Sequence, residues 1–328
     1  MKTLLKTALL SAGAVGLAFT SACGTSESGG GSDKDAAGDP VTVTDATGTD
    51  VELDGPAQTV VALEWREAET LISLGVEPAG VADAEGYSTW VGGVEPLPES
   101  TVDVGTRAEP SVDAIAELEP DLVIATGARK TEVVESIEKF VPVFMTQGTD
   151  VEDQLGNSAS DTTDIAALTG KEAEADELLG KVETRLAEVE EAIAASDNAD
   201  VPFLMGDGSK QDSTVTVRLF GEGSNLGAVA KEVGLENLWD GEVDEAWGLG
   251  NSDVEGLAKF QDTDLFFIYS NSDGESALTD GLKDNAIWQD MNFIEKDMVR
   301  ELPAGTWTFG GPSATLQFLD VLEEIYTD

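Results

Sequence analysis

The sequence predicts an α/β protein: two Rossmann-like lobes joined by a single long helix, with a ligand cleft between the lobes. Three observations support this fold class. Short apolar runs alternate with stretches of helical spacing over residues 41–160, and the same alternation returns over residues 198–328. Such alternation is typical of parallel sheets covered by helices. Between the two regions, an uninterrupted helical pattern extends from about Thr163 to Ala195.

The first residues have the order of a secretory signal. Lys2 and Lys6 make the start basic, an apolar stretch extends to Phe19, and small residues then precede Cys23. This order predicts a cleaved signal peptide over residues 1–22. Cys23 is the only cysteine of the chain, and its position at the cleavage point predicts a lipid attachment site. We therefore expect an extracytoplasmic protein anchored by lipid to the outer face of the cell membrane.

One departure keeps an alternative open for this segment. Thr20 stands where the lipid-attachment motif usually has leucine, so an ordinary cleaved signal followed by an incidental cysteine also fits. Residues 23–40 are mostly Gly, Ser, Asp and Ala, a composition that predicts a disordered linker before the folded part.

The N-terminal lobe is expected to span residues 41–160. Val41–Thr44 and Val51–Leu53 alternate around a turn and predict a hairpin. The elements expected after it are a strand at Val60–Leu63, a helix that ends at Gly75, a helix opened by Pro110, a strand at Asp121–Ala125, a helix at Glu132–Phe140 and a strand at Val141–Met145.

The linking helix is expected over residues 161–197, because apolar residues there recur near a period of 3.6. Two helices broken at Gly170 or Gly180 are the alternative. The C-terminal lobe then spans residues 198–328. Its expected strands are Phe203–Met205, Val215–Phe220 and Leu265–Tyr269, and its expected helices are Asn225–Val233, Val254–Phe260 and Ala314–Tyr326.

The composition excludes several classes of function. The chain has 65 Asp and Glu against 18 Lys and Arg, a net charge of −47. Nucleic acid is excluded as a partner, because binding its phosphates needs clustered Lys and Arg. The chain contains no histidine, which excludes imidazole triads and histidine zinc sites. With one cysteine, placed for lipid attachment, catalysis by a thiolate is not expected either.

Aromatic and polar residues gather where the strands are expected to end. The four clusters are Leu63–Arg66, Tyr87–Val91, Trp247–Gly248 and Gly305–Gly311. Open parallel sheets bind ligands beyond the carboxyl ends of their strands, so these clusters predict the walls of a cleft. Taken singly, each tryptophan is explained equally well by ordinary core packing.

Three segments closely resemble stretches of the ferric hydroxamate siderophore-binding proteins, which are substrate-binding components of ABC iron importers: Val61–Trp65, Val81–Val91 and Val102–Pro110. Two more, Glu119–Ile124 and Thr308–Ala314, are similar to the wider family that also takes up vitamin B12 and catecholate siderophores. The resemblance covers most of the chain after residue 40. It implies two α/β lobes, one long helix between them and a shallow cleft.

The resemblance also implies a site. Arg107 looks like the arginine that donates hydrogen bonds to the ligand oxygens around ferric iron, a task that suits a planar guanidinium. The aromatic residues implied for the site are Trp65, Tyr87, Trp90, Trp247, Trp307 and Phe309. Arg129 either faces the cleft, which would favour an anionic citrate or catecholate complex, or is a solvated residue at a helix start. The iron would be held by the siderophore alone, with no other cofactor.

The partners implied by the resemblance are a ferric siderophore and an ABC permease. Asp113 and Glu255 match the acidic residues, one in each lobe, that family members present to arginines on the permease. We expect a monomer that captures a ferric siderophore, of the hydroxamate type by preference. The same fold with cobalamin or a catecholate siderophore, an extracytoplasmic hydrolase, and a structural lipoprotein without a ligand are the alternatives.

Overall fold

The computed structural model describes residues 39–127, 131–211, 214–274 and 276–327. The predicted signal peptide, Cys23 and Arg129 therefore lie outside the described residues. The chain from Gly38 onward forms one compact unit. Within the described ranges, no helix has the length and apolar character needed to cross a membrane.

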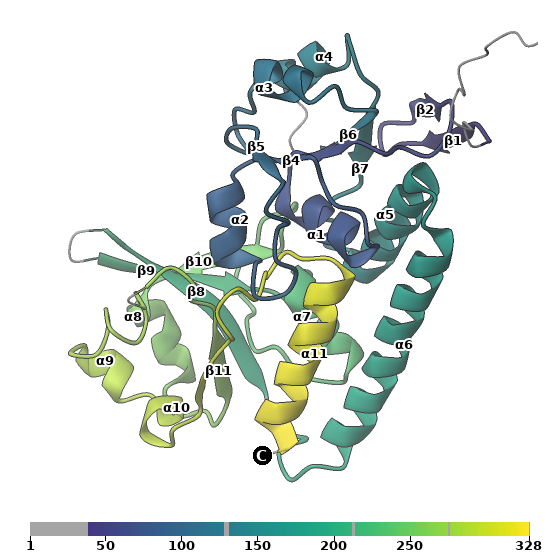
Figure 1. Ribbon diagram of the computed structural model, residues 1–328. Helices are drawn as coiled ribbons and strands as arrows, with labels where there is room; N and C mark the ends of the chain where they lie inside the picture. The colour runs from purple at the N-terminus through teal and green to yellow at the C-terminus, as the bar shows by residue number, and fades with distance from the viewer. Residues whose placement is uncertain (1–38, 128–130, 212–213, 275, 328) are drawn as a thin grey trace, which may run out of the picture. The chain divides into compact units, whose positions relative to one another are not determined.

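The N-terminal lobe is built on a parallel sheet with the strand order β5-β4-β3-β6-β7 (Figure 1). These strands are β3 (Val60–Ala62), β4 (Gly80–Val81), β5 (Val102–Asp103), β6 (Leu122–Thr126) and β7 (Val143–Thr146). The earliest strand, β3, lies in the middle, so the chain winds outward in both directions. The direction reverses between β3 and β6, where an open α/β sheet leaves a crevice at its carboxyl edge.

Helices and an antiparallel hairpin surround this sheet. The hairpin joins β1 (Val41–Thr44) to β2 (Asp50–Leu53), which confirms the prediction for that segment. The helices are α1 (Trp65–Ser73), α2 (Ala84–Trp90), α3 (Val112–Glu117) and α4 (Glu132–Ile137). Because α1 begins directly after β3, its first turn lies at the carboxyl edge of the sheet.

The C-terminal lobe repeats this strand order with different strand directions. Its sheet runs β10-β9-β8-β11-β12, in which β8, β11 and β12 are parallel while β9 is antiparallel to both of its neighbours. The strands are β8 (Phe203–Gln211), β9 (Thr214–Phe220), β10 (Leu249–Ser252), β11 (Phe266–Tyr269) and β12 (Val299–Glu301). The helical segments are α7 (Asn225–Glu232), α8 (Val254–Leu257), η2 (Ala258–Phe260), α9 (Ala286–Gln289), α10 (Asn292–Glu295) and α11 (Pro312–Thr327).

The expected uninterrupted helix over residues 161–197 is wrong in one respect. The region holds α5 (Gln154–Thr169) and α6 (Glu172–Ala194), which are separated at Gly170. Gly170 has the left-handed backbone conformation, with φ of 68°, in which glycine commonly ends a helix. The linking helix is therefore α6, whose 23 residues span about 35 Å at 1.5 Å per residue.

The two ends of α6 belong to different hydrophobic cores. Ala175 and Leu178, near its start, pack into the core of the N-terminal lobe. Val189 and Ile193, near its end, pack into the core of the C-terminal lobe. The last helix, α11, lies beside α6 (Figure 1) and also contacts α1 of the first lobe and α7 of the second. The lobes are thus joined by packed helices.

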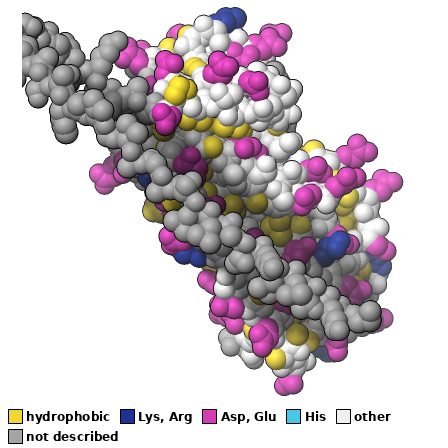
Figure 2. Space-filling model, turned by 90° about the vertical axis from the view of Figure 1, so that its right-hand side faces the viewer, with side chains coloured by type: hydrophobic (Ala, Val, Ile, Leu, Met, Phe, Trp, Pro, Cys, Tyr) yellow, Lys and Arg dark blue, Asp and Glu magenta, His cyan; other side chains and the backbone are white. Residues whose placement is uncertain are grey.

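The surface carries the excess of acidic residues. Figure 2 shows Asp and Glu side chains spread over the described part of one face, with Lys and Arg as isolated spots among them. A distribution of this kind contributes to solubility through mutual repulsion, and it makes an arginine-lined hollow stand out electrostatically.

Candidate ligand-binding site

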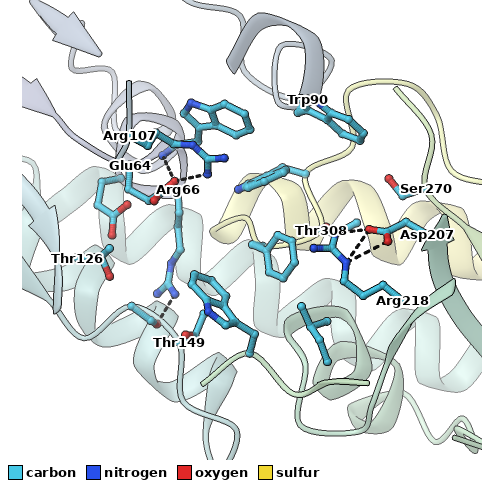
Figure 3. Close-up of a pocket in the computed structure, with 17 residues that line it drawn as sticks. Glu64, Arg66, Trp90, Arg107, Thr126, Thr149, Asp207, Arg218, Ser270 and Thr308 are labelled. Atoms are coloured by element: carbon cyan, nitrogen blue, oxygen red, sulfur yellow. Dashed lines mark hydrogen bonds and ion pairs between the residues drawn. The ribbon is translucent and has the colours of Figure 1, made fainter. Parts of the chain in front are cut away.

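A cavity of about 380 Å³ lies between the two lobes and is lined by residues of both (Figure 3). Its walls come from the carboxyl ends of β3 and β6, from the paired strands β8, β9 and β10, and from the segment before α11. The lining residues are Glu64, Trp65, Arg66, Glu67, Trp90, Arg107, Thr126, Gly148, Thr149, Asp207, Arg218, Trp247, Leu249, Ser270, Trp307, Thr308 and Phe309.

Arg107 forms the polar feature of the N-terminal wall. Its guanidinium carbon lies 3.6 Å from the centroid of the Trp65 ring, within cation–π distance. Its Nη1 donates to Glu64 Oε1 at 2.6 Å. The Trp65 ring is itself fixed, because Nε1 donates to the carbonyls of Ala82 and Asp83 at 3.1 and 3.2 Å. The guanidinium is therefore held over a ring whose own position is fixed by hydrogen bonds.

The C-terminal wall has a second arginine of similar construction. Arg218 on β9 lies directly opposite Asp207 on β8. Its Nε donates to both oxygens of Asp207, at 3.0 and 3.1 Å, and its Nη2 donates to Oδ2. The guanidinium carbon lies 5.6 Å from the centroid of Phe309. Burial raises the pKa of Asp207, and the hydrogen bonds from Arg218 oppose that shift.

A chain of aromatic rings connects the two walls. Trp307 packs edge-on against Trp65, with centroids 4.9 Å apart, and against Phe309 at 5.2 Å. Phe309 continues to Trp247 at 5.3 Å and to Phe220 at 5.8 Å. Since Trp307 packs against the first lobe's core and Phe309 against the second's, the segment before α11 carries the apolar surface across the cleft.

Two charged residues from α1 form the floor. Arg66 is buried, pairs with Asp161 Oδ2 at 2.9 Å and donates through Nη1 to the carbonyl of Gly148. Glu67 is buried beside it and accepts a hydrogen bond from Thr146 Oγ1 at 2.6 Å. Burial raises the pKa of Glu67 to about 7, against the opposing effect of the Arg66 charge. The charge of the floor therefore changes near neutral pH.

Most of the sequence-predicted site residues line this cavity. Arg107, Trp65, Trp90, Trp247, Trp307 and Phe309 are brought together there. Trp65 and Trp90 lie at the ends of helices α1 and α2, where loop positions were expected. Contact between these side chains and a ligand stays a prediction.

Tyr87 was assigned to the site wrongly. Its side chain is fully buried in the core of the N-terminal lobe, and its hydroxyl donates to the Glu95 carbonyl at 2.8 Å. The reason is local: Asp83 caps a helix through the N–H of Gly86, and that helix directs Tyr87 into the lobe. Arg129, whose orientation the sequence left open, lies outside the described residues.

Sequence reasoning missed Arg218 and Asp207 as site residues. Arg218 stands in the strand pattern of Thr214–Phe220, where it passes for an ordinary solvent-facing position. Its importance comes from its cross-strand partner, and the register that pairs it with Asp207 could not be obtained from the sequence. The sequence did offer one signal for Arg218: it is an arginine inside an otherwise apolar strand pattern, in a chain with few basic residues.

The two predicted docking residues occupy equivalent positions in the lobes. Asp113 is exposed in the first turn of α3, which is capped by Ser111. Glu255 is exposed in the first turn of α8, which is capped by Asp253. Both carboxylates are therefore solvent-accessible.

Comparison with known proteins places this chain in a family. The periplasmic binding protein family model matches residues 60–306, so the chain belongs to that family. The chain is 29% identical over 271 residues to the iron(3+)-hydroxamate-binding protein FhuD of Escherichia coli, covering 80% of this chain and 85% of that protein. It is 26% identical over 313 residues to the Fe(3+)-citrate-binding protein YfmC of Bacillus subtilis, covering 94% and 93%.

A solved structure confirms the two-lobed fold. The Fe3+–Desferal-bound siderophore-binding protein FhuD from Vibrio cholerae superposes with a TM-score of 0.71 at 24% sequence identity. The alignment covers 82% of this chain and 97% of that one. At this level of identity the likeness is one of fold.

Proposed function

We propose that this protein is an extracytoplasmic binding protein that captures a ferric siderophore, by preference of the hydroxamate type, and delivers it to an ABC permease. Cys23 would carry the lipid that tethers it to the outer face of the cell membrane, and the protein would act as a monomer. Family membership and the hydroxamate- and citrate-binding relatives support the class of ligand. The iron would be held by its carrier, and the protein would supply no metal ligand and no catalysis.

The observation that carries the proposal is the Arg107 guanidinium lying over the Trp65 ring in the wall of an aromatic cleft. A ferric siderophore presents iron-bound oxygens on an organic skeleton. Planar charged donors suit the oxygens, and indole and phenyl rings suit the carbon atoms. A cavity with a few placed polar groups among aromatic walls is typical of small-molecule sites.

The test is the affinity of an Arg107→Ala variant for ferric desferrioxamine. We expect the binding free energy to weaken by about 1.5–3 kcal/mol, the range of a hydrogen bond to a charged group, which is roughly 10- to 150-fold in Kd. Quenching of tryptophan fluorescence on titration would measure Kd, since four tryptophans line the cavity. Arg107→Lys keeps the charge but loses the planar fork, and we expect it to recover only part of the affinity.

Arg185→Ala is the matched control for this test. Arg185 lies on α6, pairs with Asp320 and Glu323 on α11, and does not line the cavity. Its replacement should leave Kd unchanged. Equal affinities of wild type and Arg107→Ala would contradict the role of Arg107.

A ligand panel separates the proposal from its alternatives. Ferric trihydroxamate, ferric citrate, a ferric tricatecholate and cobalamin would each be added in a thermal-shift assay. A ligand that binds only the folded state stabilises it by RT ln(1 + [L]/Kd), so the largest shift identifies the ligand class. Turnover of an ester or glycoside would instead favour a hydrolase.

Delivery to the permease is the second half of the proposal. Asp113 and Glu255, one on each lobe, would contact basic residues of the permease. Replacing both with Lys should reduce siderophore-dependent iron uptake by cells while Kd for the siderophore stays unchanged, because neither side chain lines the cavity. If the double variant supports normal iron uptake, these two residues are not part of the docking surface.

A further inference from the structure

The two arginines that line the cavity from opposite lobes share one construction. Each lies near an aromatic ring, Arg107 on Trp65 and Arg218 beside Phe309. Each also has part of its guanidinium bonded to a carboxylate of its own lobe, Glu64 or Asp207. Figure 3 shows these two pairs on opposite sides of the cavity with aromatic rings between them.

The Asp207–Arg218 pair is held rigidly. The two residues are directly opposite each other across β8 and β9, so the sheet register sets their separation. The Asp207 side chain is 19% exposed, whereas that of Arg218 is 42% exposed. Nε and Nη2 of the guanidinium are occupied by the carboxylate, and among the described residues Nη1 has no hydrogen-bond acceptor. Nη1 of Arg218 can therefore still donate to a ligand, while the positive charge of the guanidinium is balanced by Asp207.

The same balance extends over the described lining of the cavity. The positive residues there are Arg66, Arg107 and Arg218. Each is paired with a carboxylate, that of Asp161, Glu64 and Asp207 respectively. Donors directed at ligand oxygens are therefore present without an excess of positive charge. An uncharged ferric complex gains hydrogen bonds from such a surface. A complex with several negative charges would also meet the repulsion of the carboxylates.

We propose that Asp207 is a specificity-determining residue that orients Arg218 toward the ligand and, by its charge, disfavours multiply anionic ferric complexes relative to uncharged trihydroxamates. The inference rests on the proposed function and adds the charge of the ligand to it. Asp207 acts through Arg218 and through its field, so it is a positioning and selectivity residue. Glu64 would act in the same way on Arg107 in the other lobe.

Asp207→Asn tests the proposal, because asparagine keeps the size of the side chain and one acceptor for Arg218. The probes are the uncharged ferric complex of desferrioxamine acetylated at its free amine, and a trianionic ferric tricatecholate. Affinities would be measured by tryptophan quenching at low and at high salt. We expect wild type to bind the uncharged complex more tightly. In the variant we expect the affinity ratio to move toward the trianion by about tenfold or more, because one negative charge is removed from the lining of the cavity. High salt should shrink that change.

Two further variants complete the design. Asp290→Asn removes one charge from an exposed position of the same lobe that does not line the cavity, and its affinity ratio should equal that of wild type. Arg218→Gln removes the proposed donor and should weaken the uncharged complex by roughly tenfold.

The outcomes separate this inference from the function on which it rests. The proposal is supported if the affinity ratio shifts in Asp207→Asn and stays at the wild-type value in Asp290→Asn. Equal changes for both probes, a wild-type preference for the trianion, or an Arg218→Gln variant with unchanged affinities would overturn it while ferric siderophore binding stands. Failure of the wild type to bind either probe would overturn the proposed function itself.

Discussion

Glu67 is a carboxylate that the fold buries at the floor of the cleft at a cost in free energy. Its Oε1 accepts from Thr146, whereas Oε2 has no hydrogen-bond partner among the described residues. Burial raises its pKa from 4.5 to about 7, and Glu64 and Asp161 add smaller effects in the same direction while Arg66 opposes them. The folded state therefore holds this proton over a pH range in which the unfolded chain has released it.

The sign of the pH dependence follows from that difference. Between pH about 4.5 and about 7 the folded state binds more protons at Glu67 than the unfolded state does, so stability falls as pH rises through this window. Above the folded-state pKa the loss is complete. A pKa difference of one unit corresponds to about 1.4 kcal/mol, so the rise from 4.5 to about 7 makes the buried charge cost roughly 3 kcal/mol at pH 8.

Glu67→Gln should consequently stabilise the protein at pH 8 by about 1–3 kcal/mol and change little at pH 5, because the amide resembles the protonated acid. Urea unfolding at pH 5, 6, 7 and 8 measures this: the difference in unfolding free energy between variant and wild type should increase as pH rises. Glu77→Gln, at an exposed position, should give a flat difference. A stability gap for Glu67→Gln that is the same at pH 5 and pH 8 would contradict the assigned pKa.

At the scale of residues, the sequence predicted the part of the site that local motifs carry. Arg107 and five of the six predicted aromatic residues line the cavity, because their segments lie at helix ends and in connections between elements where the two lobes face each other. Tyr87 could not be separated from Trp90, since burial is decided by how α2 packs. Asp207 and Arg218 become a pair only through the register of β8 and β9.

At the scale of elements, the start of α11 is attached to the N-terminal lobe by hydrogen bonds to α1. Glu69 on α1 accepts hydrogen bonds from the backbone N–H groups of Gly311 and Ala314, both at 2.8 Å. These are donors of a first helical turn, which has no partner within its own helix. The approach requires glycine at position 310, because an added Cβ there would lie 2.6 Å from Glu69 Oε2. Glu69 thus caps α11 from another element.

A second contact reinforces this cap. Ser313, in the first turn of α11, lies 2.7 Å from the Ser73 hydroxyl and donates to Glu95 Oε1 at 3.0 Å. The carboxylate of Glu69 and the hydroxyl of Ser313 together attach α11 to the N-terminal lobe, although its far end packs in the C-terminal core.

Glu69→Ala should destabilise the protein by about 2–4 kcal/mol at pH 8, because two buried N–H groups lose their acceptors. Chemical unfolding monitored by far-UV circular dichroism would measure the loss. Burial also raises the pKa of Glu69 to about 7, so the ionised form that accepts both hydrogen bonds is fully populated only above that pH. Glu190→Ala, an exposed position on α6, should stay within about 0.5 kcal/mol of wild type. A similar small effect for Glu69→Ala would refute the cap.

The elements themselves could be predicted well where a pattern is local and strong. The hairpin at the start of the first lobe and the buried strands at 122–126 and 266–269 are confirmed. The break at Gly170 was one of two open possibilities, because a periodic apolar pattern can continue across a helix end when both helices pack on the same core. Gly180 stays inside α6, and an added Cβ there would meet no other part of the described structure within 4 Å, so no close packing requires glycine.

For the folded unit as a whole, the lobes share two helices. Both α6 and α11 pack in the N-terminal core at one end and in the C-terminal core at the other. Gln154 on α5 adds a hydrogen bond to the carbonyl of Gly223 in the second lobe, at 3.0 Å. Large rotation of one lobe against the other would require these packed surfaces to separate, which costs the free energy of the buried apolar area.

The cleft is therefore expected to be largely formed before a ligand arrives. Spin labels at Asp113→Cys and Glu255→Cys, one exposed residue on each lobe, would report the separation of the lobes in a chain whose Cys23 is replaced by Ser. Pulsed electron paramagnetic resonance should show that the mean distance between the two spin labels changes by less than about 3 Å on saturation with ferric desferrioxamine, as in other pre-formed sites. Iron-free desferrioxamine is the control, since it shares the organic skeleton and lacks the metal-bound oxygens. A shift of about 10 Å or more would mean that the helices are a hinge, and the Glu69 cap would then have to break on every binding cycle.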